Sequence, residues 1–135
     1  MDRDPITVEE LLAAAREGID RYAPEETAAA LRGGAILIDI RPQEQIERDG
    51  AVPGATVVAR NVAEWRLDPE GEHRNADLAR RDREIIVICD EGYQSSLVAA
   101  NLVRLGLRAG DVIGGVQEWR QRGLPLSREP SARVA

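Results

Sequence analysis

A short run of β-branched residues, Glu84-Ile85-Ile86-Val87-Ile88, constrains the fold of this chain more than any other stretch. Polar and apolar side chains do not alternate in it, which is typical of a strand buried on both faces. Such strands belong to parallel sheets that carry helices on both sides. A polar turn at residues 89–96 follows, and beyond it apolar residues recur at helical spacing, at Leu97, Val98, Leu102 and Leu105. The pattern therefore predicts a strand, a loop and a helix in direct succession.

The loop holds the only cysteine of the chain, in the sequence Cys89-Asp90-Glu91-Gly92-Tyr93-Gln94-Ser95-Ser96. We expect Cys89 at the C-terminal end of the strand, with the free N–H groups of the following helix pointing back at its sulfur. Gly92 allows a positive φ at which successive N–H groups converge, and Ser95 and Ser96 are predicted to cap the helix. Donors so placed lower the pKa of cysteine thiols from ~8.5 into roughly 3.5–7.5. The sequence therefore predicts a reactive thiolate rather than an inert buried cysteine.

The rest of the chain alternates between helix and strand patterns. Thr7-Val8-Glu9-Glu10 is a capping box, and the helix it starts has an apolar stripe at Val8, Leu11, Leu12, Ala15 and Ile19. A second helix is predicted from Pro24 to Leu31, so that two helices precede the first strand. Strands are expected at 35–40, 56–59 and 109–113, helical segments at 43–49, 60–66 and 116–123, and either a weak helix or a linker at 78–83.

Strands that alternate with helices form right-handed βαβ crossovers. The fold class is therefore α/β, with a mainly parallel central sheet, helices on both faces and a helical N-terminal extension. We expect this extension over residues 1–33, packed on a domain over residues 34–127. The tail is residues 128–135, and we expect the chain to fray from Ser127 onward. Ligands of such sheets bind at the C-terminal strand ends, where Cys89, Asp39 and Arg41 are expected to lie.

Composition narrows the classes of partner. The chain has 18 basic and 24 acidic residues and a formal net charge of −6, which does not favour binding to nucleic acid. No apolar run reaches the ~18 residues of a membrane span, and no export signal follows the charged N-terminus. One cysteine excludes an internal disulfide, a CxxC pair and a cysteine zinc cluster. We expect a cytoplasmic protein with no metal and no cofactor, and no pattern indicates its oligomeric state.

Three separated segments resemble the rhodanese family in its single-domain form. The first rhodanese signature is a strand ending in Asp-x-Arg followed by a glycine-proline turn, and residues 36–41 and 50–55 resemble it. The C-terminal signature resembles Gly114-Gly115-Val116-Gln117-Glu118-Trp119 with residues 123–126. Cys89 and the residues after it occupy the place of the active-site loop between the two signatures.

The resemblance implies a sulfurtransferase that takes sulfane sulfur from thiosulfate or a persulfide and passes it to a thiol or cyanide through a Cys89 persulfide. Its partners would be a small sulfur-containing substrate or a persulfide or thiol protein. The implied active-site loop is Asp90, Glu91, Gly92, Tyr93, Gln94 and Ser95. Asp39 and Arg41 are interpreted as an ion pair that supports this loop.

The loop departs from the family pattern in its charges. Gln94 stands where many active relatives carry Arg or Lys, and Asp90 and Glu91 would repel a dianionic donor if they face the pocket. We expect Arg60, which follows the strand at 56–59, to supply the anion contact that Gln94 cannot. A persulfide is therefore favoured over thiosulfate as the donor.

Two other functions remain open on this fold. The cell-cycle type of dual-specificity phosphatase has a loop one residue longer that ends in arginine, and Ser95 at that position disfavours phosphoryl chemistry. The other function is that of a non-catalytic module that binds a ligand or senses sulfur or redox state. Gln94 and the acidic pair Asp90 and Glu91 keep this alternative open. Turnover with a thiol acceptor discriminates between these functions.

Overall fold

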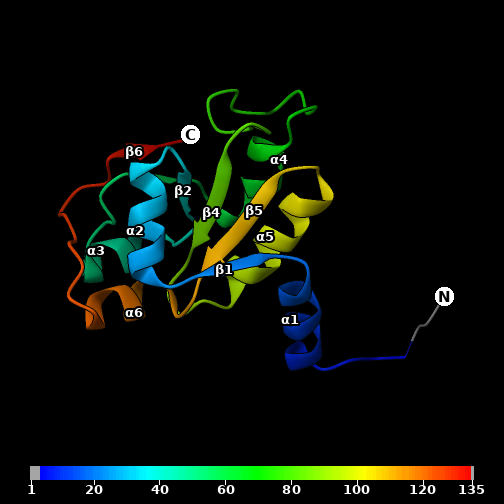
Figure 1. Cartoon of the computed structure of the whole chain (residues 1–135), viewed down its shortest axis with the longest axis horizontal. Coiled ribbons are helices and arrows are strands. Elements are labelled where there is room, and N and C mark those ends of the chain that lie inside the picture. The colour runs from blue at the N-terminus through cyan, green and yellow to red at the C-terminus, as the bar shows by residue number, and fades with distance from the viewer. Residues whose placement is uncertain (1–3, 135) are drawn as a thin grey trace.

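Strand β4 (Glu84–Ile88) lies at the centre of a six-stranded sheet in the computed structural model, which describes residues 4–134 (Figure 1). The strand order is β1-β5-β4-β2-β3-β6, and every pairing between these strands is parallel. The other strands are β1 (Asp20–Tyr22), β2 (Ile36–Asp39), β3 (Ala55–Val57), β5 (Arg108–Val112) and β6 (Ala132–Arg133). The predicted α/β class with a parallel sheet is confirmed.

Helices cover both faces of the sheet (Figure 1). One face packs against α4 (Ala63–Leu67) and α5 (Gln94–Arg104), and the other against α2 (Pro24–Arg32) and α6 (Gly115–Gln121). The remaining helices are α1 (Val8–Glu17), α3 (Gln43–Asp49) and the short 3₁₀ helix η1 (Arg60–Val62). The residues of β4 alternate between the two cores: Ile85 and Val87 face α5, and Ile86 and Ile88 face α6. All four are fully buried, which explains the apolar run.

The N-terminal segment differs from its prediction in two ways. Helix α1 has the expected capping box between Thr7 and Glu10, but Val8 and Leu11 of its stripe are exposed. In addition, the short strand β1 lies between the first two helices, so the prediction that two helices precede the first strand is wrong. Backbone pairing with β5 holds β1 in place. The two strands approach so closely that a Cβ at Gly110 would lie 2.2 Å from the Asp20 carbonyl oxygen. A strand held by close backbone approach leaves no apolar pattern to detect.

The C-terminal segment is ordered against the sheet, so the prediction of a frayed tail from Ser127 is wrong for the described residues. Ser127 and Ala51 exchange backbone hydrogen bonds of 2.8 and 2.7 Å, and β6 then pairs with β3. Residue 135 of that tail, like residues 1–3 of the extension, lies outside the described part of the chain. Residues 78–83 contain turns and no helix. Of the two predicted alternatives, the linker is therefore the one that the structure supports.

None of the helices in residues 4–134 has the length and apolar character that a membrane span requires.

Candidate active site

The Cys89 sulfur lies inside a cup of loop donors at the C-terminal end of β4. The backbone N–H groups of Gly92 and Ser95 donate to Sγ over 3.2 and 3.4 Å, and the thiol donates to Ser95 Oγ over 3.3 Å. Gly92 has a φ of +89°, which lets its N–H turn toward the sulfur. The expectation that loop N–H groups converge on Cys89 is confirmed. Donors held in this geometry stabilise negative charge on sulfur.

The back of the loop is fixed by the start of α6. Val116 N donates to the Cys89 carbonyl over 2.9 Å, and Gln117 N donates to the Asp90 carbonyl over 3.1 Å. Gly115 has a φ of +61°, and a Cβ there would lie 2.5 Å from the Cys89 oxygen. The glycine pair that precedes α6 is therefore required for this close backbone contact. It brings together two segments that are 27 positions apart in the sequence.

A buried carboxylate organises the start of α5. Asp111, at 0% exposure on β5, accepts hydrogen bonds from the Ser95 and Ser96 hydroxyls over 2.8 and 2.7 Å. Arg21 of β1 pairs with the same carboxylate over 2.9 and 3.3 Å. The prediction that Ser95 and Ser96 cap the helix is wrong, because Asp111 takes both hydroxyls and α5 begins without a side-chain cap. An aspartate inside an apolar strand needs partners when buried, and this signal could have revealed Asp111.

Arg16 of α1 reaches the loop from outside. Its Nη2 donates to the Gly92 carbonyl over 2.8 Å and its Nε to Ser96 Oγ over 3.0 Å. The C=O and N–H of a trans peptide point in opposite directions, so this contact also fixes the Tyr93 N–H, which points away from Arg16. No periodicity in the sequence indicated this residue. Arg16 ties the N-terminal helix to the loop that holds Cys89.

We expect Arg16→Met to loosen the loop without unfolding the protein. Hydrogen bonds to charged groups contribute about 1.5–3 kcal/mol, so the Gly92 and Ser95 amides should exchange with solvent roughly 10- to 100-fold faster. Hydrogen exchange followed by NMR measures these rates. Arg32→Met, at an exposed arginine in the last turn of α2, is the control and should leave them unchanged. Unchanged protection in Arg16→Met would show that Arg16 does not hold the loop.

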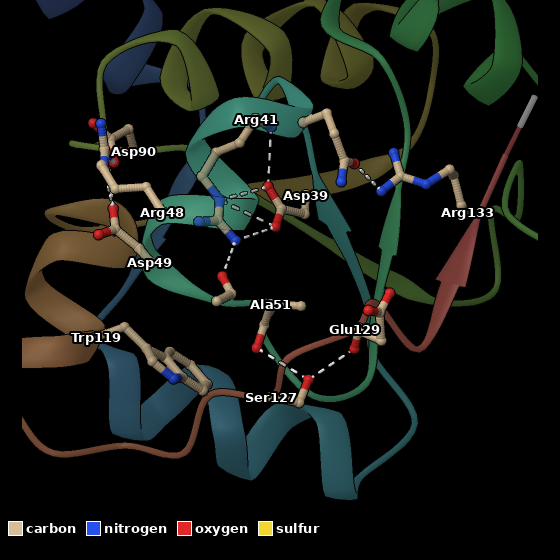
Figure 2. Close-up of polar contacts among 12 residues, drawn as sticks. Asp39, Arg41, Arg48, Asp49, Ala51, Asp90, Trp119, Ser127, Glu129 and Arg133 are labelled. Carbon is tan, nitrogen blue, oxygen red and sulfur yellow. Dashed lines mark hydrogen bonds and ion pairs between the residues drawn. The ribbon is translucent and has the colours of Figure 1, made fainter.

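The acidic residues after Cys89 differ in their surroundings. Asp90 Oδ1 accepts hydrogen bonds from Arg48 Nη2 over 2.9 Å and from Gln117 Nε2 over 2.8 Å. Arg48 also binds Asp49, and it lies between the two carboxylates in Figure 2. The hydrogen bond from Arg48 lowers the pKa of Asp49, with help from Gln117. The guanidinium of Arg48 and the amide of Gln117 thus offset the charge of Asp90, whereas Glu91 is exposed.

Asp39 and Arg41 form the expected ion pair where β2 ends (Figure 2). Arg41 Nη2 lies 2.7 Å from Asp39 Oδ2, and both side chains are 0–1% exposed. The same Nη2 donates to the Gly50 carbonyl over 2.9 Å, which joins the strand end to the turn at 50–55. Arg41 Nη1 is the one buried side-chain nitrogen or oxygen in residues 4–134 without a hydrogen bond. Arg41 of this pair bounds the space beside the cysteine.

A pocket of about 210 Å³ opens over the sulfur, which we call the cysteine pocket. Its walls include Arg41, Gln45, Cys89, Asp90, Glu91 and Gln94. Arg60 is not among the residues that line it. It lines a neighbouring pocket together with Arg41 and Gln94. In residues 4–134 no group of three or more His, Cys, Asp or Glu side chains is arranged to hold a metal ion.

Comparisons with known proteins agree with this geometry. The family model of the rhodanese-like domain matches residues 23–122. The chain is 34% identical over 102 residues to thiosulfate sulfurtransferase GlpE of Pseudomonas entomophila, which covers 74% of this chain and 84% of GlpE. It is also 34% identical over 85 residues to adenylyltransferase and sulfurtransferase UBA4 of Candida albicans, covering 62% of this chain and only 19% of UBA4.

Solved structures share the fold over nearly the whole chain. One is a Rhodopseudomonas palustris protein of unknown function, described as a possible tyrosine phosphatase. It superposes with a TM-score of 0.82 at 26% identity and covers 93% of this chain and 98% of its own. The similarity therefore extends beyond residues 23–122.

Proposed function

Because the chain belongs to the rhodanese-like domain family, we propose that it is a sulfurtransferase that carries sulfane sulfur as a persulfide on Cys89. The observation that carries this proposal is the pair of N–H donors, from Gly92 and Ser95, aimed at the buried sulfur. The same donors stabilise the Cys89 thiolate before it takes up sulfur and the persulfide anion afterwards. Arg16, Asp111 and the start of α6 keep the loop in this shape.

The reaction proceeds in two displacements at sulfur. The Cys89 thiolate attacks the outer sulfur of the donor, an Sγ–S bond forms, and the donor S–S bond breaks. Its electron pair leaves on the rest of the donor, which is a thiolate for a persulfide and sulfite for thiosulfate. The acceptor, a thiolate or cyanide, then attacks the terminal sulfur of the Cys89 persulfide. The Sγ–S bond breaks and its electron pair returns to Sγ. Negative charge stays on sulfur throughout, which is what the loop N–H groups stabilise.

The charges of the cysteine pocket favour a persulfide over thiosulfate as the donor. Glu91 is exposed there, and Arg41 is paired with Asp39. A cation in place of Gln94, ~4 Å from a bound anion, would contribute up to about 4 kcal/mol at an effective dielectric of 20. Without such a cation, a dianion such as thiosulfate binds weakly. A persulfide carries less charge at its reacting end and therefore loses less from the absence of the cation.

The two alternatives differ from this proposal at the same loop. For a phosphatase, a phosphate would need an arginine clamp, but the position is Ser95 and its hydroxyl donates to Asp111. A non-catalytic module, in which Cys89 takes up sulfur or is oxidised reversibly or does not react, is supported by Gln94 and Glu91, which weaken donor binding. Such a module would not turn over.

Intact-protein mass spectrometry tests the proposal. The protein is incubated with thiosulfate or, separately, with a low-molecular-weight persulfide, and Cys89→Ser is treated in parallel. We expect a gain of one sulfur atom that requires Cys89, is larger with the persulfide and is removed by cyanide. If neither donor adds sulfur while iodoacetamide still alkylates Cys89, the sulfurtransferase proposal is wrong and the non-catalytic module is supported.

A further inference from the structure

A second pocket, of about 450 Å³, adjoins the cysteine pocket at the C-terminal edge of the sheet. It lies where β2, β3 and β6 end, and we call it the arginine pocket after Arg60 and Arg133; its polar walls also include Gln43, Asn61 and Gln94. The two pockets share four wall residues: Ile40, Arg41, Pro42 and Gln94. Gln94 therefore lies at the boundary between the two pockets.

The two pockets differ in the charged groups that line them. The cysteine pocket has two carboxylates in its wall, those of Asp90 and Glu91, whereas no carboxylate lines the arginine pocket among the described residues. Arg60 is only partly compensated, by an i,i+4 contact of 3.3 Å to Glu64 at 36% exposure. The electrostatic attraction on an anionic group is therefore stronger in the arginine pocket than in the space directly over the sulfur.

Arg133 forms no ion pair with a carboxylate among the described residues. Its Nη2 donates to the neutral side-chain oxygen of Gln43, and Figure 2 shows it extending from β6 toward the end of β2, where Asp39 and Arg41 lie. Arg60 approaches from the segment after β3. Two guanidinium groups from separate segments suit carboxylates, which they bind in a planar, bidentate way.

We propose that the arginine pocket binds the carboxylate end of a low-molecular-weight thiol or persulfide while its sulfur end reaches Cys89. This inference rests on the proposed function and names the substrate class: an elongated organic thiol with carboxylate groups. Thiosulfate is small enough for the cysteine pocket alone and would leave both arginines unused. Arg60 and Arg133 thus act as specificity residues outside the loop.

Sulfur transfer from a matched pair of donors tests the assignment. The donors are glutathione persulfide and the persulfide of glutathione diethyl ester, in which both carboxylates are esterified and carry no charge. Arg60→Met and Arg133→Met should each raise the KM for glutathione persulfide roughly tenfold with kcat unchanged, because they remove uniform binding. The diester should be transferred equally by the wild type and the variants. Arg32→Met should behave as the wild type with both donors.

Two results would overturn the assignment: an unchanged KM for glutathione persulfide in both variants, or an equal loss with the diester. A binding measurement separates failure of the assignment from failure of the proposed function. S-methylglutathione cannot transfer sulfur, so calorimetric titration of Cys89→Ser reports the pocket alone. Affinity that falls roughly tenfold on adding Arg60→Met or Arg133→Met supports the pocket even if no sulfur is transferred. No binding to Cys89→Ser, or the same affinity with and without the arginines, excludes it.

Discussion

Replacing Asp39 with asparagine is expected to lower the free energy of unfolding by about 3–5 kcal/mol, because the Arg41 guanidinium is left as a buried charge without a carboxylate. A domain of this size is stable by roughly 5–15 kcal/mol, so the loss is a large share of the total. The turn at Gly50, held by the same guanidinium, should loosen with it. Urea unfolding at neutral pH measures the change.

The chain offers a matched control for this substitution. Arg80 and Asp82 have the same spacing of two residues and the same separation, 2.7 Å between Nη2 and Oδ2, but both side chains are exposed. Asp82→Asn should leave the unfolding midpoint unchanged, because solvent screens an exposed pair. Equal midpoints for Asp39→Asn and Asp82→Asn would mean that burial of the first pair has no energetic consequence.

Gly115→Ala is expected to destabilise the protein by about 2–5 kcal/mol and to displace the active-site loop. A non-glycine residue at positive φ costs about 1–2 kcal/mol, and overpacking against fixed backbone adds about 1–3 kcal/mol. The new Cβ would lie 2.5 Å from the Cys89 oxygen and 2.6 Å from the Asp90 oxygen. Denaturant unfolding measures the first effect, and sulfur loading of Cys89 measures the second.

Gly123→Ala separates the two causes. Gly123 has a φ of +71°, close to that of Gly115, but a Cβ there would meet nothing within 4 Å. Its alanine variant should lose only the backbone cost of about 1–2 kcal/mol and keep full sulfur loading. If both variants load sulfur as the wild type does, the contact between α6 and the loop is not needed to position Cys89.

The sequence predicts those parts of the fold that carry a local pattern. The apolar run of β4, the capping box of α1 and the Asp-x-Arg strand end all depend on residues close together in the chain. Strands β1 and β6 escaped prediction because backbone pairing with β5 and β3 holds them, and backbone pairing leaves no mark on side-chain periodicity.

The candidate site divides in the same way. Cys89, Gly92 and the ion pair of Asp39 with Arg41 follow from local spacing. Arg16 and Arg21 do not, since they reach partners 76 to 90 positions away in the sequence. Their contacts depend on how α1 and β1 pack on the finished sheet, which only the three-dimensional structure reveals.

Strands β1 and β6, the first and last strands in chain order, occupy the two edges of the sheet. An exposed edge offers unpaired backbone groups to a second copy of the chain and can start aggregation. Both edge strands are very short and carry charged residues: Asp20 and Arg21 on β1, and Arg133 on β6. Natural sheets use short, charged edges to prevent such pairing. The segments outside the matched residues 23–122 therefore supply both edges of the sheet, in the short and charged form that disfavours such pairing.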